Sequence, residues 1–277
     1  MRGLPLLNIL PCILVSAVCF CVDAPEAASD KPESSIITVT IVYDNNSWDP
    51  RLKTDWGFGC VIIGTEKTIL FDTGGKGDLL LANMKALAIS PSDIDVIVLS
   101  HIHSDHIGGL SAVLAENANV SVYIPKSFPN KIRHLVKAAG ADVIDVSHPE
   151  NICRDVYSVG EMGTWIKEQS LFIVGKTGIS VITGCAHPGI LNISRRASEL
   201  AKMRVELVAG GFHLGGASDN EIESVIKGLK NLGVSRAAPC HCSGDRARAL
   251  FERAFPRGYI GAGVGTILQV ESKIRED

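Results

Sequence analysis

Four side chains of types that bind metals lie within six residues of the segment SHIHSDHIGG, which spans residues 100–109. In an extended chain, residues two apart point the same way, so His101 and His103 can face one point. Asp105 would lie close by, and His106 would be turned to the side. Neutral imidazoles with a carboxylate suit zinc, manganese or iron, and the segment offers enough ligands to begin two sites. The pattern indicates a metal centre, with a solvated histidine-rich loop as the alternative.

Five apolar segments typical of β-strands each end in a small-residue loop that carries Asp or His. In layered α/β proteins, loops at the carboxyl ends of strands gather at one edge and build the site. Six of the eight histidines lie in these loops. His134, inside an expected helix, and His148, before a proline, are interpreted as ordinary surface or core histidines. We therefore expect one site, assembled from the loops that begin at Asp72, His101, Gly184, Gly210 and Cys240.

The periodicity of apolar residues predicts one domain with alternating strands and helices, without repeats or a long linker. Helices are expected at 78–87, 110–116, 130–139, 193–202, 220–232 and 245–255. Strands are expected at 36–43, 60–63, 68–71, 94–99, 120–124, 141–146, 153–158, 165–174, 178–183, 205–209, 234–238 and 266–270.

The 277 residues are 46% hydrophobic, enough for one large core, and carry a net charge of −3 without a basic block. A nucleic-acid-binding surface is therefore not expected. We expect a small-molecule substrate instead. The five cysteines from residue 60 onward are odd in number and scattered, which argues against a disulfide framework.

The first residues resemble a secretory signal peptide. An apolar run at 4–22 follows Arg2, and a small-residue stretch ends near residue 28. Pro5, Asn8 and Pro11 interrupt the run, which disfavours a membrane-spanning helix, although an uncleaved anchor is the alternative. We expect a signal peptide at 1–28, a linker at 29–35 and a domain at 36–272. The mature protein would be periplasmic or secreted, without a stable membrane span.

The motif order resembles that of the metallo-β-lactamase fold superfamily: FDTG, then HIHSDH, an isolated His, a glycine-rich loop and a last His. Within it, TDWGFGC, TGCAHPGILN, GGFHL and PCHCSG resemble the branch named for 7,8-dihydropterin-6-methyl-4-(β-D-ribofuranosyl)-aminobenzene-5′-phosphate synthase, a pterin-condensing enzyme. The resemblance covers residues 38–270. It implies an α+β fold, a four-layer αβ/βα sandwich of two mixed sheets flanked by helices.

The resemblance also implies two metal ions, expected to be zinc, with manganese or iron possible. The first would be bound by His101, His103 and His187, and the second by Asp105, His106 and His241. Asp72 matches the superfamily's first motif, whose carboxylate orients the ligands without contacting the metal. A plain turn residue before Gly74 is the alternative reading of Asp72.

One departure from the superfamily pattern concerns the second metal. The superfamily commonly supplies a bridging Asp between the third and last His motifs, but residues 209–214 read AGGFHL, without a carboxylate before Asp219. Either His213 takes a metal or substrate role, or the second metal is weakly held. Cys185 and Cys242 could add thiolates, although buried packing is the favoured reading of both.

These features predict a hydrolase of esters, phosphoesters or related bonds, with a metal-bound hydroxide as nucleophile. Asp105 would steer the nucleophile or accept its proton, and His213 is a second catalytic candidate. The residues expected to contact substrate are Asn45, Asp55, Trp56, Phe58, His213 and Ser243.

Two alternatives stay open: a pterin transferase like the synthase, and a non-catalytic metal- or ligand-binding protein on the same fold. An exported protein would have poor access to a cytosolic pterin intermediate, which favours the hydrolase. A redox di-iron protein of this fold would typically carry Glu in place of His103.

Overall fold

The computed structural model describes residues 1, 3 and 36–272. Contacts divide the chain into two units, Met1–Asp30 and Lys31–Asp277, and every described helix and strand lies in the second. The apolar run, the expected cleavage region and the expected linker at 29–35 lie outside the described residues. Among the residues that are described, no helix combines the length and apolar character needed to cross a membrane.

The first sheet is mixed and has the strand order β13-β1-β2-β3-β4-β5-β6. Strands β3 to β6 run parallel to one another, whereas β13, β1, β2 and β3 pair antiparallel. The strands are β1 (Ile36–Asp44), β2 (Phe58–Ile63), β3 (Ile69–Phe71), β4 (Val96–Val98), β5 (Ser121–Pro125), β6 (Asp142–Val146) and β13 (Ile267–Glu271).

The second sheet is also mixed and has the order β12-β11-β10-β9-β8-β7. Its parallel part is β10, β11 and β12, and the remaining neighbours pair antiparallel. The strands are β7 (Glu150–Cys153), β8 (Val156–Ser158), β9 (Leu171–Val174), β10 (Ile179–Thr183), β11 (Val205–Gly211) and β12 (Arg236–Cys240).

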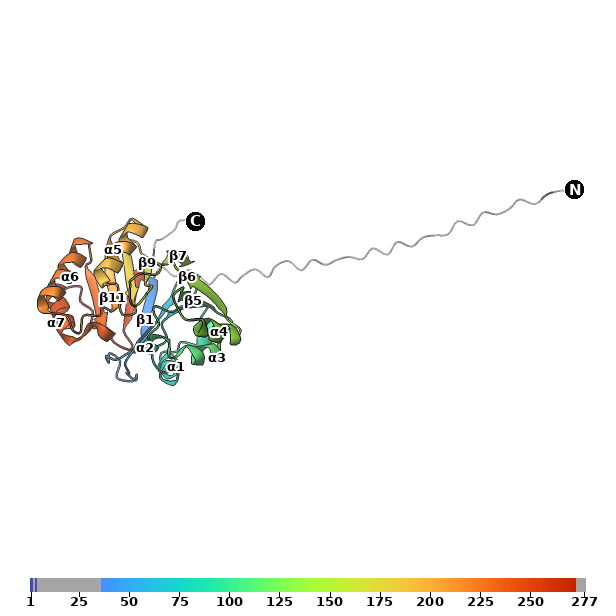
Figure 1. Ribbon diagram of the computed structural model, residues 1–277, viewed down its shortest axis with the longest axis horizontal. Helices are drawn as coiled ribbons and strands as arrows, with labels where there is room; N and C mark the ends of the chain where they lie inside the picture. The colour runs from blue at the N-terminus through green and yellow to red at the C-terminus, as the bar shows by residue number, and fades with distance from the viewer. Residues whose placement is uncertain (2, 4–35, 273–277) are drawn as a thin grey trace. The chain divides into compact units, whose positions relative to one another are not determined.

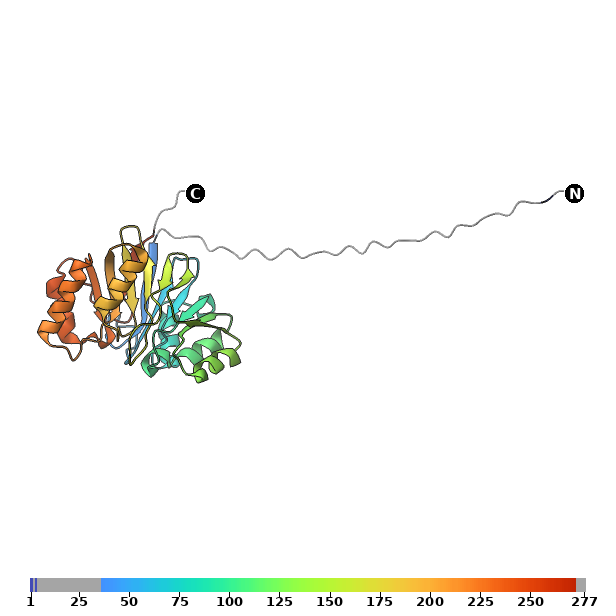
Figure 2. The ribbon, with the colours of Figure 1, turned by 45° about the horizontal axis from the view of Figure 1, so that its top comes forward.

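Helices cover the outer face of each sheet (Figures 1 and 2). Those on the first sheet are α1 (Gly77–Ala86), α3 (Leu110–Glu116) and α4 (Asn130–Ala138). Those on the second are α5 (Ile190–Ala201), α6 (Asp219–Asn231) and α7 (Asp245–Ala254). Three short helices complete the set: η1 (Pro91–Asp93), α2 (Ser104–Ile107) and η2 (His241–Ser243). The layers are helix, sheet, sheet, helix, so the four-layer sandwich expected from the resemblance is confirmed.

Alternation along the strands explains the layers. In β2, Phe58, Cys60 and Ile62 enter the core between the sheets, whereas Val61 packs under the helices of the first sheet. Successive side chains of a strand point to opposite faces, so a strand buried on both faces must be apolar throughout. The two sheets are thereby held face to face, and their strand ends come together.

Two expected strands are wrong in extent. The segment 153–158, predicted as one strand, is a hairpin of β7 and β8 that turns at Arg154 and Asp155. Asp155 has φ 63°, a left-handed conformation that Asp tolerates, which permits the tight turn. The strand predicted at 165–174 is confined to β9, because residues 165–170 form a loop that reaches the site.

Candidate metal centre

The five strand ends singled out in the sequence meet at one edge of the sandwich. Asp72 follows β3 and His101 lies just after β4 in the first sheet, while His187, His213 and His241 follow β10, β11 and β12 in the second. The imidazole centroids of His101 and His187 are 4.7 Å apart, so the ends of the two sheets are in contact. The centre is therefore built from both sheets.

The HIHSDH segment is only partly extended. His103 has the extended dihedrals φ −65° and ψ 144°, and the short helix α2 begins at the next residue. The change from strand to helix explains why His106 is not turned to the side: it points inward and is fully buried. Asp105, on the same helical turn, keeps its carboxylate partly exposed.

One cluster, the first triad, consists of His101, His103 and His187. Their ligand atoms all lie within 4.8 Å of one another. Nε2 of His101 is 3.1 Å from Nδ1 of His103, and Nε2 of His187 is buried without a hydrogen-bond partner. A buried polar atom without a partner is costly, so it points to a missing ligand.

A second cluster, the second triad, consists of Asp105, His106 and His241. Nε2 of His106 is 3.2 Å from Nε2 of His241 and 3.6 Å from Oδ2 of Asp105, and the His241–Asp105 distance is 3.4 Å. Donors at about 2.0–2.1 Å from a tetrahedral zinc lie roughly 3.3 Å from one another. These three distances match three corners of such a tetrahedron.

Hydrogen bonds on the far side of the rings set which nitrogen faces the centre. Nδ1 of His106 lies 2.7 Å from the Asp72 carboxylate, and Nδ1 of His241 lies 2.9 Å from the amide oxygen of Asn45. Both partners only accept, so each neutral ring carries its hydrogen on Nδ1. The two Nε2 atoms then face each other as lone pairs, an arrangement that a cation between them would stabilise.

Ser100 extends the same control to the first triad. Its hydroxyl donates to Oδ2 of Asp72 at 2.6 Å, so it can only accept from Nδ1 of His101, which is 2.9 Å away. Nε2 of His101 is thereby left as a lone pair directed at the triad. The single carboxylate of Asp72 thus orients one ligand in each triad, the arrangement that second partners of metal-binding histidines provide.

Burial and neighbouring charges keep His101, His187 and Asp105 in the states that bind a metal. Burial, then the neighbouring histidines, lowers the pKa of His101, and the same causes lower that of His187 to about 4. Burial opposes ionisation of Asp105, but His241 and His106 outweigh it and lower its pKa to about 2. Burial likewise opposes protonation of His106, yet the Asp72 carboxylate raises its pKa. The donor set therefore fits one or two divalent metals.

The structure brings Cys185 and Cys242, whose favoured reading was buried packing, close to the ligands, and it adds Glu168, which was not expected as functional. Sγ of Cys185 is 3.2 Å from Nε2 of His106, and Cys242 shares a cluster of possible ligands with Cys185 and His241. The buried carboxylate of Glu168 accepts three backbone N–H groups, from residues 185, 186 and 187, at 2.8–3.0 Å. In the sequence, Cys185 and Cys242 stand next to or near ligand histidines, which could have indicated a role at the site. No sequence feature of Glu168 indicated one.

Several expected substrate contacts have other partners. Phe58 lies in the core between the sheets, edge-on to Phe71, rather than at the opening of the site. Ser243 is fully buried, and its hydroxyl accepts the N–H of Phe212 at 3.0 Å. Asp55 pairs with Lys76 at 2.5 Å. Burial or an ion pair therefore engages these three side chains.

Trp56 and His213 lie at the rim. Trp56 is 56% exposed, and its ring centroid is 4.9 Å from that of His241. His213 is exposed and lies 4.4 Å, between centroids, from His187. A cluster of possible ligands also joins His213 to Cys185 and His187. Both side chains are thus available to a molecule that reaches the triads.

Four residues of the site have left-handed backbone conformations: Asp72 (φ 58°), Ala186 (57°), His213 (53°) and His241 (48°). Such conformations are uncommon outside glycine and cost about 1–3 kcal/mol each. Strain of this kind persists where the surrounding structure requires it, which here is the aiming of side chains at the two triads.

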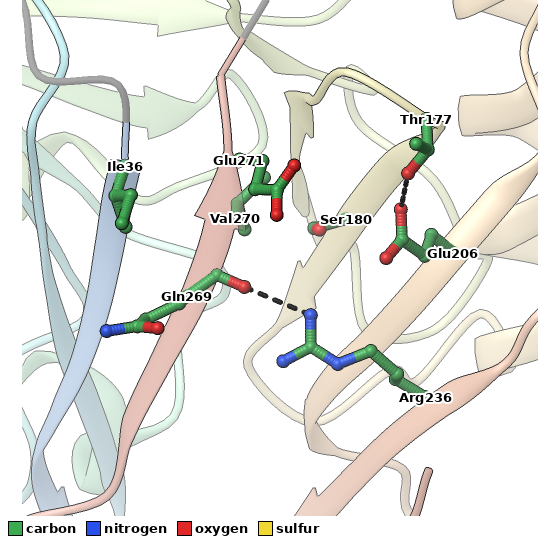
Figure 3. A pocket seen from close by; sticks show the side chains of 8 residues that line it. All are labelled: Ile36, Thr177, Ser180, Glu206, Arg236, Gln269, Val270 and Glu271. Carbon is green, nitrogen blue, oxygen red and sulfur yellow. Dashed lines mark hydrogen bonds between the residues drawn. The ribbon is translucent and has the colours of Figure 1, made fainter.

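A pocket of about 380 Å³ lies at the other end of β11, away from the triads (Figure 3). Its polar groups bind one another: Thr177 donates to Glu206, and Arg236 donates to the Gln269 carbonyl at 3.0 Å. These pairs do not converge on an open point, so we do not assign a site here. The remaining lining residues are Ile36, Ser180, Val270 and Glu271.

Comparisons with known proteins agree with this geometry. Residues 60–192 match the model of the metallo-β-lactamase superfamily. The chain is 29% identical to the 7,8-dihydropterin-6-methyl-4-(β-D-ribofuranosyl)-aminobenzene-5′-phosphate synthase of Methanocaldococcus jannaschii over 251 residues, covering 74% of this chain and 85% of the synthase. An uncharacterised protein of the same organism is 28% identical over 263 residues, covering 82% of this chain and 99% of that protein.

Solved structures give the same result. A metal-dependent hydrolase of the β-lactamase superfamily superposes with a TM-score of 0.71 at 27% identity, covering 85% of this chain and 100% of the hydrolase. A metallo-β-lactamase fold protein from Bacillus subtilis superposes with a TM-score of 0.64 at 14% identity, covering 84% and 99%, which supports the fold alone. The matched family model over residues 60–192, the four layers and the two ligand triads at the sheet edge together give this chain the metallo-β-lactamase fold and its similarity to that superfamily.

Proposed function

We propose that the protein is a metal-dependent hydrolase with a dinuclear, zinc-type centre that acts on an ester, phosphoester or related bond. The observation that carries the proposal is the second triad, whose three donor atoms lie 3.2–3.6 Å apart with two histidine lone pairs facing each other. Two divalent metals would polarise a substrate oxygen and lower the pKa of a bound water towards ~7. The superfamily match and the similarity to a metal-dependent hydrolase support the same class.

The chain's own groups divide the work around the two triads. Asp105 has a partly exposed carboxylate beside both His106 and His241, which suits it to hold and accept the proton of an attacking water. His213, exposed at the rim beside His187, is placed to donate a proton to a leaving group. Trp56 offers a ring face on which a substrate can stack.

The test is metal content per chain, measured by elemental analysis on protein purified without added metal, for wild type and His241→Ala. We expect about two equivalents in wild type and about one in the variant, because the second triad loses a ligand. Ester and phosphoester substrates are then screened with and without a chelator. One equivalent that is unaffected by His241→Ala would overturn the dinuclear centre, and two equivalents without any chelator-sensitive hydrolysis would overturn the hydrolase.

A pterin transferase is the second candidate, because the similarity to the M. jannaschii synthase covers 74% of this chain. It is tested by following, with mass spectrometry, formation of the compound in the synthase's name. Product formation that needs the metals, together with no hydrolysis in the screen, would favour the transferase. Metal binding with neither activity would favour a metal- or ligand-binding protein on this fold.

We also propose export and a small-molecule substrate, on the strength of the signal-peptide pattern and the net charge of −3 without a basic block. N-terminal sequencing of the protein recovered from an expressing cell tests the first. A mature terminus near residue 29 in the exported fraction is expected, and an intact Met1 in the cytosolic fraction alone would contradict export.

A further inference from the structure

The thiol of Cys185 lies between the two triads. Its Sγ atom lies within 4.8 Å of the ligand atoms of His101 and His187 in the first triad, and of His106 and His241 in the second. Within the triads, His101 and His106 share a cluster of possible ligands with each other. Outside the triads, Cys185 is the side chain among the described residues that shares such clusters with members of both. A ligand common to two metals must occupy such a position.

The distance to the second triad suits a shared metal. Sγ of Cys185 is 3.2 Å from Nε2 of His106, and the two atoms belong to a fully buried cluster with His101. Zinc–sulfur bonds of about 2.3 Å and zinc–nitrogen bonds of about 2.1 Å place the two donors on one metal roughly 3.6 Å apart. Because Nδ1 of His106 already faces Asp72, its Nε2 lone pair is directed at this sulfur and at the centre.

Neither Gly211 nor Phe212, at the end of β11, can place a side chain in this position. A Cβ added to Gly211 would lie 2.4 Å from the Gly184 carbonyl and 2.8 Å from Sγ of Cys242. The next residue, Phe212, is buried against Phe251 under the helices, away from the metal ligands. The side chain that enters the space between the triads therefore comes from the loop after β10, where Cys185 is located.

Charge balance at the proposed centre favours an anionic ligand. Asp105 is the one carboxylate in the two triads, whereas two divalent ions would bring four positive charges into a largely buried site. A buried charge is stable only when it is paired, and a thiol that contacts such an ion is deprotonated outright.

We propose that the thiolate of Cys185 bridges the two metals, which rests on the proposed dinuclear centre. Glu168 fixes the backbone of residues 185, 186 and 187, which includes Cys185, because its carboxylate accepts their N–H groups. Cys242 shares a cluster of possible ligands with His241 of the second triad but, in the described part of the chain, with no member of the first, and its Sγ donates to the carbonyl oxygen of Cys185 at 3.7 Å.

The test uses cobalt in place of the native metal, because a thiolate bound to Co²⁺ gives an intense near-ultraviolet charge-transfer band that nitrogen and oxygen ligands do not give. Reduced metal-free protein is titrated with Co²⁺ and followed by absorption. Wild type is compared with Cys185→Ser and with Cys242→Ser, the matched control. Circular dichroism establishes that each variant is folded.

We expect the band in wild type and in Cys242→Ser, and its loss in Cys185→Ser. A band that persists in Cys185→Ser, or is lost in Cys242→Ser alone, would overturn the assignment. Bridging is tested with His103→Ala and His241→Ala, which disable one triad each. If the thiolate bridges the two metals, the band remains in both variants. A band in only one variant would show that the thiolate binds a single metal, which would overturn the bridge.

The two proposals fail in different ways. If wild type takes up two Co²⁺ per chain without the band, the dinuclear centre stands and the thiolate bridge is wrong. If wild type takes up no Co²⁺, the proposed function fails first, because neither triad holds a metal.

Discussion

Oδ2 of Asp72 lies 2.7 Å from Nδ1 of His106, and neither side chain is exposed to solvent. The same carboxylate accepts the hydroxyl and backbone N–H of Ser100, which in turn contacts His101. One buried anion therefore sets the orientation of a ligand in each triad. Its left-handed backbone, with φ 58°, fixes the direction of the carboxylate.

Asp72→Asn should weaken binding of both metals. Asn has a similar size and tolerates the left-handed backbone, so the fold is retained, but its amide no longer accepts from every partner. Loss of such a partner costs about 10–100-fold in metal affinity. The measurement is competition with a fluorescent chelator. Asp145→Asn, which breaks an exposed pair with Arg133, serves as the control and should leave affinity unchanged. Equal affinity in Asp72→Asn would show that the carboxylate does not orient the ligands.

Asn45→Ala should weaken the second metal alone. The Asn45 amide oxygen lies 2.9 Å from Nδ1 of His241, and no member of the first triad contacts it in the described hydrogen bonds. Without this acceptor His241 loses its fixed tautomer, so affinity for the second equivalent falls about 10-fold. Calorimetric titration resolves the two equivalents. The exposed Asn119→Ala is the control, and a matching loss at the first equivalent would contradict the division into two triads.

Gly211→Ala should damage both stability and metal binding. The added Cβ would lie 2.4 Å from the Gly184 carbonyl and 2.8 Å from Sγ of Cys242, both within the site's own loops. Overpacking of this kind costs about 1–3 kcal/mol of unfolding free energy. Gly216→Ala is the matched control, since nothing lies within 4 Å of its added Cβ, and it should change stability by less than about 0.5 kcal/mol. Denaturant unfolding of metal-free and metal-loaded protein measures both effects, and two indistinguishable variants would refute the steric argument.

Glu168 should make the stability of the metal-free protein depend on pH. Burial raises the pKa of this carboxyl to about 7, from 4.5, against the opposing effect of the three backbone N–H groups that it accepts. A raised pKa stabilises the folded state fully below pH about 4.5, and the contribution is lost as pH rises through about 7. Glu168→Gln lacks this dependence, so wild type should lose up to roughly 3 kcal/mol relative to the variant across that window. Unfolding in the presence of a chelator, at pH 4.5, 5.5, 6.5 and 7.5, provides the comparison; parallel profiles would exclude the titration.

The sequence predicted what depends on strand ends and local spacing. The HIHSDH segment and the single histidines after β10, β11 and β12 are recognisable as possible metal ligands by residue type. The parallel order of the strands brings them to one edge. The four-layer fold followed from the resemblance. The turn within 153–158 was missed, because an Asp in a left-handed turn does not interrupt the apolar pattern.

Residues whose role comes from distant partners could not be predicted. Glu168 precedes β9 by a few residues and looks like a surface acid, but it is buried against the loop that carries His187. Asn45 meets His241 across 196 residues of sequence, and no local pattern encodes that pairing. Phe58 follows an aromatic loop motif, yet the antiparallel pairing of β2 turns its side chain into the core.

Each triad draws ligands from both sheets, so bound metals would stabilise the contact between the two sheets. His101 and His103 come from the first sheet and His187 from the second; Asp105 and His106 are likewise joined by His241. A ligand that binds only the assembled state favours assembly by mass action. Residues 36–146 and 150–272, produced as two polypeptides, share the pairing of β1 with β13, and they would associate more tightly with metal than without it.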